Sequence, residues 1–173
     1  MIYIVRHGET QWNTLGKIQG RQDIELNENG KNQALLLKER FKDVKFDKVF
    51  SSPLKRALQT AQIITKNKII VDERLIERDN GLLEGKIKKE IKILPNFNDD
   101  NDTKYGVESL KSIKFRLDSF YTEILQKYPK KNILVVTHAG VGIYTKCYFV
   151  GEPKDGDYTN YKLKNGEVWI FEN

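Results

Sequence analysis

Two segments near opposite ends of the chain share one local pattern, in which an apolar, β-branched run is followed by a histidine and then a glycine. Residues 2–5 precede His7 and residues 133–136 precede His138, and these are the only two histidines among 173 residues. Each run has the composition of a buried strand, and the glycine lets the backbone turn sharply beside a ligand. Ligands bind at the carboxyl ends of strands in open α/β sheets. The repeated pattern therefore predicts one site that contains both imidazoles, with two unrelated structural histidines as the alternative.

Strand-like and helix-like segments alternate along the chain. Apolar runs predict strands at residues 2–5, 48–50, 69–71, 132–136, 159–164 and 167–171, and helical periodicity predicts helices at residues 28–40, 53–66, 107–127 and 140–149. Such alternation is typical of parallel strands joined by right-handed crossovers, with helices on both faces of the sheet. Asn165-Gly166 separates the last two predicted strands and is a two-residue hairpin signal. We therefore expect a three-layer α/β/α fold with a mostly parallel central sheet and an antiparallel C-terminal hairpin.

Length and composition bound the class of protein. A chain of 173 residues is long enough for one ordinary domain, and we expect a single domain over residues 1–173. The hydrophobic content of 39% is that of a globular protein, and the apolar runs are too short to cross a bilayer. Because the first predicted strand begins at residue 2, no signal peptide fits before it. The single cysteine, Cys147, cannot form an internal disulfide. These features predict a cytoplasmic protein, and they leave its oligomeric state open.

The net charge of +6 has three possible explanations: nucleic-acid binding, anionic small substrates, or a lysine-rich solvated surface. The lysines are scattered, with local clusters at residues 86–89 and 127–131, and no basic tail or basic stripe with interleaved aromatic residues occurs. A nucleic-acid-binding module also leaves the two histidine segments unexplained. We expect no nucleic-acid partner and no membrane partner.

Residues 72–105 are the least regular part of the sequence, rich in polar and turn-forming residues, and we expect a loop or lid there. Asp99, Asp100 and Asp102 form an acidic cluster within it. This cluster lacks the glycine and the terminal glutamate of a calcium-binding loop, so a solvated loop is the better interpretation. The two histidines are not part of any known zinc-ligand spacing either. We therefore expect no metal.

The chain resembles the histidine phosphatase (phosphoglycerate mutase-like) superfamily through motifs in matching order and spacing. The first motif is Arg6-His7-Gly8-Glu9-Thr10, and the last is Thr137-His138-Ala139-Gly140. Between them lie Asn13, Gly16-Lys17-Ile18-Gln19-Gly20, Leu26-Asn27-Glu28-Asn29-Gly30, Ser51-Ser52-Pro53-Leu54-Lys55-Arg56-Ala57-Leu58-Gln59-Thr60-Ala61, Glu77, Glu84-Gly85 and Gly106-Val107-Glu108-Ser109. The resemblance extends from residue 2 to about residue 145.

The resemblance implies phosphoryl transfer without a metal or other cofactor. His7 is the implied nucleophile, which attacks phosphorus and becomes a phosphohistidine. It must be unprotonated to attack, and the guanidinium charges of Arg6 and Arg56 oppose its protonation. The same two arginines are suited to bind the three non-bridging phosphate oxygens in planar forks. His138 is the implied clamp on the transition state.

The local sequence also predicts an anion-binding position for Arg56. Ser52 is a suitable helix cap and Pro53 suits the first helical position, so Arg56 is expected in the first turn of the helix at residues 53–66. The free N–H groups of a helix N-terminus favour anions, and an arginine there adds charge to a phosphate niche. An arginine on a solvated face, like the neighbouring Lys55, is the simpler alternative, and the resemblance favours the inward role.

Glu77 is the general acid that the resemblance implies. It would protonate the leaving alkoxide and then activate water for the second step. From the residues alone, Glu84 and Glu9 remain open as candidates, and a surface salt bridge with Arg78 is the simpler explanation of Glu77.

The loop after the first strand supplies the remaining implied contacts. Asn13, Gln19 and Gly20 lie there, where the family binds phosphate through amides and backbone N–H groups. The chain departs from the family at Leu83, where a tryptophan is usual, and at Asn80, near a usual aromatic residue. These departures leave the walls of the site undetermined.

Phosphatase and phosphoglycerate mutase are the two activities to separate. The mutases resemble this chain, but they have a larger middle insertion and a C-terminal tail that help to enclose the site. Only 20 residues lie between Gly85 and Gly106, and residues 16–20 resemble the phosphatase branch. An open site lets water reach the phosphohistidine. The sequence therefore predicts a metal-independent phosphomonoesterase for a small phosphorylated metabolite, without distinguishing phosphosugars, phosphoglycerates, α-ribazole phosphate and phosphoamino acids.

Overall fold

The computed structural model describes residues 1–95 and 99–173, in which five strands form one mixed sheet in the order β3-β2-β4-β1-β5. The strands are β1 (Ile2–Arg6), β2 (Lys48–Ser51), β3 (Ile69–Val71), β4 (Ile133–Thr137) and β5 (Val168–Phe171). Neighbouring strands are parallel except for β5, which runs antiparallel to β1. The predicted mostly parallel sheet is therefore confirmed.

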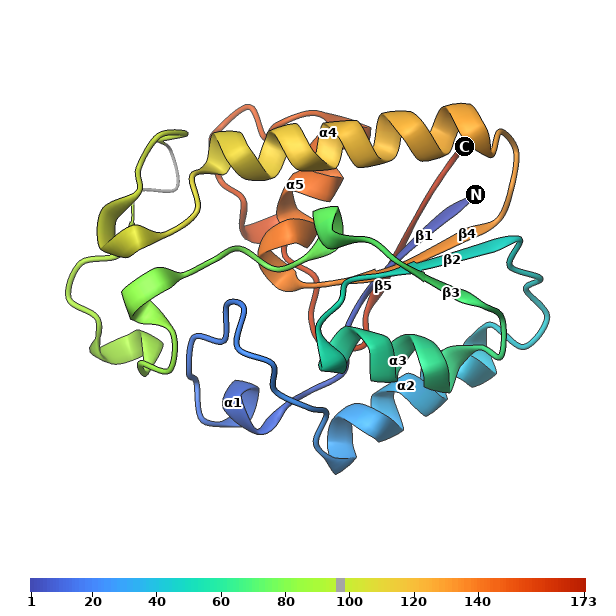
Figure 1. Ribbon diagram of the computed structural model, residues 1–173, viewed down its shortest axis with the longest axis horizontal. Coiled ribbons are helices and arrows are strands. Elements are labelled where there is room, and N and C mark those ends of the chain that lie inside the picture. Colours follow the sequence, from blue (N-terminus) through green and yellow to red (C-terminus); the bar gives the residue numbers. More distant parts are fainter. Residues whose placement is uncertain (96–98) are drawn as a thin grey trace.

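Helices cover both faces of this sheet (Figure 1). The α-helices are α1 (Gln11–Thr14), α2 (Glu28–Arg40), α3 (Lys55–Ile64), α4 (Leu110–Lys127) and α5 (Ala139–Val150). Helices α2 and α3 lie on one face, and α4 and α5 lie on the other. Short 3-10 helices are η1 (Glu73–Leu75), η2 (Gly81–Leu83), η3 (Lys88–Glu90), η4 (Lys104–Gly106) and η5 (Thr159–Tyr161). The predicted three-layer α/β/α architecture is confirmed.

The alternating direction of side chains along β1 and β4 explains why helices cover both faces of the sheet. In β1, Ile4 belongs to the apolar cluster under α4 and α5, whereas Val5 belongs to the cluster under α2 and α3. In β4, Val135 and Val136 divide in the same way. Successive strand residues point to opposite faces, so a run that is apolar throughout needs two covering layers. Each fully buried side chain of this kind stabilises the fold by about 1.5–3 kcal/mol.

The register of the central pair places the two histidines side by side. Strands β1 and β4 are adjacent and parallel, with Arg6 opposite Thr137. The next residue after each strand is a histidine, and the His7 N–H donates to the carbonyl of Thr137 over 3.0 Å. Both imidazoles therefore leave the sheet at the same edge, as the repeated sequence pattern predicted.

The C-terminal strand has a different partner from the predicted one. No strand forms at residues 159–164 of the described chain, where residues 159–161 are η5 and the rest is irregular. Strand β5 pairs with β1, and the turn before β5 closes against β1 through Gly166 N–H to Arg6 O and Arg6 N–H to Glu167 O, each over 3.2 Å. Because β4 occupies only one edge of β1, the other edge is available for pairing. The predicted antiparallel strand is confirmed, but the local hairpin was wrong.

The irregular middle segment lies beside the sheet edge that bears the histidines. Its described part contains only η1 to η4, as expected for a loop, and residues 96–98 of that predicted loop or lid lie outside the described residues. Asp100 pairs with Lys114 over 2.9 Å, and Asp99 and Asp102 accept backbone N–H groups within their own turns. In the described residues, no group of histidine, cysteine and carboxylate side chains is arranged to hold a metal, and no helix is long and apolar enough to cross a membrane.

Candidate active site

The two histidines form the buried floor of the site. Their ring centroids are 5.1 Å apart, and the side chains are almost fully shielded from solvent, with 2% of His7 and none of His138 exposed. Burial in a weakly polar environment disfavours the charged imidazolium. The two imidazoles therefore lie close together in one buried environment at the strand ends.

The ring of His7 is held in one tautomer. Nδ1 lies 2.7 Å from the carbonyl oxygen of Gly8, so it must carry the proton and donate it there. Nε2 is then the lone-pair nitrogen, and it accepts from the Arg56 Nε–H over 3.3 Å. Burial, followed by the positive charges of Arg56 and Arg6, lowers the pKa of His7 well below its ordinary value. The result is a neutral imidazole with Nε2 directed at a guanidinium group.

Residues far apart in the sequence fix the loop that carries His7. The Gly8 N–H donates to Thr60 Oγ1 of α3 over 3.0 Å. Asn165 Nδ2, from the turn before β5, donates to the carbonyls of His7 and Gly8 over 3.0 and 3.3 Å. A Cβ at Gly8 would lie 2.3 Å from the carbonyl oxygen of Gly30, so only glycine fits there. Thr60 and Asn165 were not predicted as supports, because no local pattern marks a residue that bonds to a distant loop.

His138 is positioned by Ser52 rather than by a backbone carbonyl. Its Nε2 lies 2.7 Å from Ser52 Oγ, and its buried Nδ1 has no hydrogen-bond partner among the described residues. Burial lowers the pKa of His138 well below its ordinary value, and the charges of Arg56, His7 and Arg6 act in the same direction.

The predicted capping role of Ser52 was wrong. Helix α3 begins at Lys55, two residues later than expected, because the backbone of Leu54 is extended. The Lys55 N–H donates to the side chain of Asp23 over 2.7 Å, so a distant loop provides the capping bond. Ser52 is thereby available to His138, while its Oγ also accepts from the Leu54 N–H over 3.3 Å.

Arg56 lies in the first turn of α3 and points inward, as predicted. Only 1% of its side chain is exposed, and burial lowers its pKa to about 10. Its Nη1 and Nη2 each donate over 2.7 Å, to the carbonyls of Gln22 and Gly20, while Nε faces His7. Arg6 approaches from β1, with Nη1 donating to the carbonyl of Leu163 over 2.9 Å and a buried Nε that has no partner in the described chain. The two guanidinium groups thus bring positive charge to the nucleophile.

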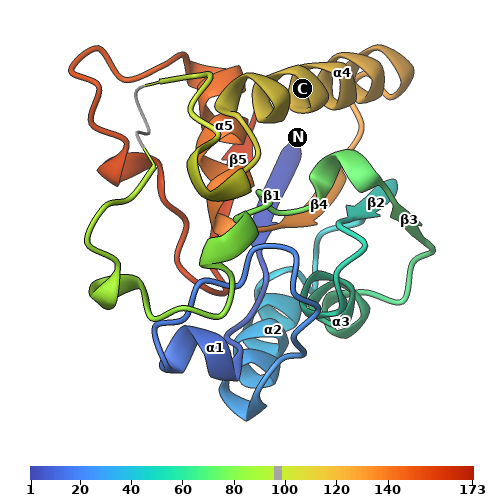
Figure 2. The same ribbon diagram turned by 60° about the vertical axis from the view of Figure 1, so that its left-hand side comes forward.

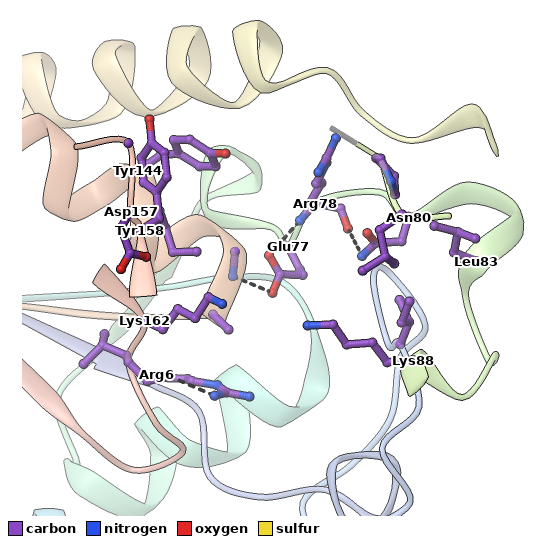
Figure 3. Close-up of a pocket in the computed structure, with 18 residues that line it drawn as sticks. Arg6, Glu77, Arg78, Asn80, Leu83, Lys88, Tyr144, Asp157, Tyr158 and Lys162 are labelled. Atoms are coloured by element: carbon purple, nitrogen blue, oxygen red, sulfur yellow. Dashed lines mark hydrogen bonds between the residues drawn. The ribbon is translucent and has the colours of Figure 1, made fainter. Parts of the chain in front are cut away.

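Glu77 is held at the first turn of α5. Its Oε1 accepts from the backbone N–H groups of Arg78 and Val141 over 2.9 and 3.2 Å, and its Oε2 accepts from Gly140 N–H over 3.1 Å (Figure 3). Gly140 follows His138 by two residues, so this arrangement fixes the carboxylate beside the histidine pair. The free N–H groups and the dipole of a helix N-terminus favour a negative group there.

The two other candidate carboxylates have different positions. Glu9 accepts from Asn27 Nδ2 over 2.9 Å, and this bond is the main cause that lowers the Glu9 pKa. Glu84 accepts from the backbone N–H groups of Arg21 and Asn80 over 2.8 and 3.1 Å. Both residues tie loops together. Of these three glutamates, Glu77 alone lines the large cavity, whose described lining includes Ala139 and Gly140 but neither histidine.

This cavity has a volume of about 580 Å³. Segments of the loop after β1, of the middle segment and of the chain before β5 surround it, and Figure 2 shows these segments on one side of the molecule. Arg6 and Glu77 line it, and so do Ala139 and Gly140, which directly follow His138. Its walls include Asn80 and Leu83, the positions that depart from the family pattern.

Asn13, Gln19 and Gly20 lie near the nucleophile loop but do not line the large cavity. Asn13 Oδ1 and Gln19 Oε1 share the single hydroxyl hydrogen of Thr10, with Oγ1 at 3.1 and 3.0 Å, whereas their amide nitrogens make no hydrogen bond within the described chain. Those NH₂ groups are available as donors. Gly20 has a φ of +51°, and a Cβ there would collide with Glu84, so this position also requires glycine.

The two imidazoles allow a direct measurement of the site's electrostatics. At pH 5.5, a histidine with a pKa of about 6.5 is about nine-tenths charged. Because burial and the arginines lower both pKa values, we expect both rings to remain largely neutral at pH 5.5, with the His7 proton on Nδ1. Two-bond ¹H–¹⁵N spectra report protonation and tautomer, and His7→Gln assigns the signals.

The lowered pKa values of the two histidines also predict how the free energy of unfolding changes with pH. The unfolded chain binds more protons than the folded protein once the pH falls toward about 6.5, so the free energy of unfolding should decrease from there downward. A titration midpoint near 6.5 for either ring in the folded protein would contradict the proposed electrostatic environment.

Comparisons with known proteins agree with this geometry. The model of the histidine phosphatase superfamily (branch 1) matches residues 2–172. Phosphoglycerate mutase-like protein 4 of Arabidopsis thaliana is 41% identical over 153 residues, which cover 81% of this chain and 66% of that protein. Phosphoserine phosphatase 1 of Hydrogenobacter thermophilus is 34% identical over 147 residues, which cover 79% of this chain and 70% of that protein. The chain thus spans about two thirds of the length of these relatives.

A solved structure shares both sequence and fold with the chain. It is phosphoserine phosphatase from Entamoeba histolytica in complex with 3-phosphoglyceric acid, with 30% sequence identity and a TM-score of 0.82. The match covers 96% of this chain and 87% of that chain.

Proposed function

Because this chain belongs to the histidine phosphatase superfamily, we propose that it is a metal-independent phosphomonoesterase that forms a phosphohistidine on His7. One observation carries the proposal. The His7 imidazole is buried and neutral, with Nδ1 donating to a carbonyl and the Nε2 lone pair facing Arg56. This is the state in which an imidazole is a nucleophile, and the nearby positive charge favours binding of the phosphate dianion.

In the first step, His7 Nε2 attacks phosphorus as the bond from phosphorus to the ester oxygen breaks. Arg6, Arg56 and His138 stabilise the charge on the transferring phosphoryl oxygens. The leaving alkoxide takes a proton from the Glu77 carboxyl group, which lines the cavity and is held by the backbone N–H of Gly140, two residues after His138. The products of this step are phosphohistidine, the free alcohol and the Glu77 carboxylate.

In the second step, water attacks the phosphorus of the phosphohistidine. Glu77 accepts a proton from that water, the bond from phosphorus to Nε2 breaks, and inorganic phosphate leaves. His7 returns to its neutral state and Glu77 to its protonated state, so the cycle needs no other reactant. The Asn13 and Gln19 amide groups and the backbone at Gly20 are proposed as further phosphate donors from the loop after β1.

The choice of water as acceptor is supported by the cavity and by the relatives. The cavity wall in the middle segment is short, because only 20 residues lie between Gly85 and Gly106. Two of the similar proteins described above are phosphoserine phosphatases. A small phosphorylated metabolite is therefore the proposed substrate, and the cytoplasm, in keeping with the single cysteine, is the proposed location.

Hydrolysis without a metal is the first test of this proposal. The protein should release phosphate from p-nitrophenyl phosphate and 3-phosphoglycerate at the same rate with and without EDTA, because its charge comes from arginine and histidine side chains. Phosphate release is measured with molybdate dye, and added Mg²⁺ after chelation is the matched control. Activity that EDTA abolishes and a divalent ion restores would contradict metal independence.

Phosphoglycerate mutase activity is the second candidate, because a relative with 41% identity is mutase-like. The incubation with 3-phosphoglycerate separates the two when a catalytic amount of 2,3-bisphosphoglycerate is added. A phosphatase yields phosphate and little 2-phosphoglycerate. Isomerisation at enzymatic rates, about 1–1,000 per second, with little phosphate release would assign the protein to the mutases.

A further inference from the structure

The large cavity contains two lysines that the proposed reaction does not use. Lys88 belongs to η3 in the middle segment, and Lys162 follows η5 in the segment before β5. Figure 3 shows their side chains extending from opposite sides of Glu77, with both amines directed at the space between them. Neither ammonium group has a hydrogen bond or ion pair within the described residues.

The charges around the cavity are unequal. Its described lining has four cationic side chains, Arg6, Arg78, Lys88 and Lys162, and two carboxylates, Glu77 and Asp157. Glu77 is held by backbone N–H groups of α5, and it forms no ion pair with either lysine in the described part of the chain. A concave surface with excess charge of one sign focuses its field and attracts the opposite charge.

The reacting phosphate accounts for only part of this excess, because Arg6 is assigned to it and the two lysines are not. Arg6, Arg56 and the two histidines gather at the carboxyl ends of β1 and β4, where the phosphoryl group is proposed to bind. The lysines come from other walls of the cavity, Lys88 from η3 and Lys162 from the segment after η5. The lining of the cavity also contains Leu83, Ile143 and Tyr144, which provide apolar surface for a short carbon skeleton.

We propose that Lys88 and Lys162 form a subsite for a second anionic group, so that the preferred substrate is a phosphomonoester whose alcohol part carries a carboxylate or another phosphate. This inference rests on the proposed function. An ammonium group is a point charge with freely rotating donors, unlike the planar fork of arginine, and it can bind either anion. The cavity thereby selects acidic phosphoesters over esters of neutral alcohols such as unmodified sugars.

Matched substrate pairs test the subsite. 3-Phosphoglycerate and glycerol 3-phosphate differ by a carboxylate in place of a hydroxymethyl group. Propane-1,3-diol bisphosphate and 3-hydroxypropyl phosphate form the corresponding pair for a second phosphate. We expect kcat/KM to be higher for the doubly anionic member of at least one pair, and the pair that shows it identifies the anion. Added salt should reduce this preference, because both lysines are exposed.

Substitutions then assign the preference to the two lysines. Lys88→Gln and Lys162→Gln should each lower kcat/KM for the doubly anionic substrate by about threefold to tenfold, as for partly screened charges. Each should leave the substrate with one anion within about twofold of the unsubstituted protein. Lys86→Gln and Lys164→Gln remove exposed lysines from the same two segments without touching the large cavity, and they should change neither value.

The outcomes separate this inference from the proposed function. Equal kcat/KM values within both pairs, or equal losses for both members of a pair in the lysine variants, would overturn the subsite while hydrolysis stands. If no substrate is hydrolysed, calorimetry tests the subsite through binding. It measures the Kd of each substrate for the His7→Ala protein, with and without Lys88→Gln and Lys162→Gln. If the Kd changes neither with the second anionic group of the substrate nor with the lysine substitutions, the subsite is overturned as well.

Discussion

His7→Ala is expected to abolish both turnover and the phosphoenzyme, with a loss in kcat of about 10⁵–10⁶-fold, as for other removed nucleophiles. The reason is the geometry of the two imidazoles. His138 bonds to Ser52 through Nε2 and lacks the carbonyl contact that fixes the tautomer of His7. No other histidine exists in the chain. Quenching with ³²P-labelled substrate, followed by acid and alkaline washes, measures a phosphohistidine, which survives alkali and not acid.

His138→Gln is the matched control, because it removes the other imidazole and keeps the nucleophile. It should slow the reaction strongly and still give a detectable phosphoenzyme on His7. His7→Ala should fold, because the Gly8 N–H and the Asn165 side chain hold the backbone at His7 independently of its ring. His7→Gln provides a second variant, in which the glutamine side chain fills the space of the imidazole. A phosphoenzyme that persists in His7→Ala would overturn the assignment.

The fold was predictable where local pattern and tertiary structure agree. The runs at residues 2–5 and 133–136 are apolar on both faces, and this requires two helical layers whatever the details of the loops. The pairing of β5 was not predictable in the same way. Asn165-Gly166 is a valid turn signal, but the free edge of β1 decides which strand accepts β5. The single domain over residues 1–173 stays a prediction.

The site residues at the strand ends and at the start of α3 could be predicted from the sequence, whereas the residues that hold them in place could not. His7, His138 and Arg56 were placed by motif and by helix position, and the structure buries all three together. Ser52 and Asn165 act through contacts over 86 and 158 positions of sequence, which no local pattern marks. The resemblance pointed to Glu77, but the residues alone left Glu9 and Glu84 open, because only tertiary structure shows which carboxylate faces the cavity.

Glu77→Gln is expected to separate proton transfer from nucleophilic attack. The amide keeps the size of the side chain but has no proton to give to a leaving alkoxide. With 3-phosphoglycerate, the rate of phosphoenzyme formation should therefore fall by about 10²–10⁴-fold, the range of general acid catalysis. With p-nitrophenyl phosphate the loss should be much smaller, because nitrophenolate is stable without a proton. Rapid chemical quench isolates this step from the later hydrolysis.

The hydrogen bonds at α5 require a control for this variant. Both oxygens of Glu77 accept backbone N–H groups, so an amide NH₂ must face at least one donor, and some loss of stability is expected. A loss that comes only from displacement of the side chain would affect both leaving groups equally, whereas loss of the acid affects them unequally. Glu9→Gln changes a carboxylate outside the cavity and should leave the ratio of the two rates unchanged. Equal losses for both leaving groups in Glu77→Gln would remove Glu77 from the acid role, and Glu84 would then be tested in the same way.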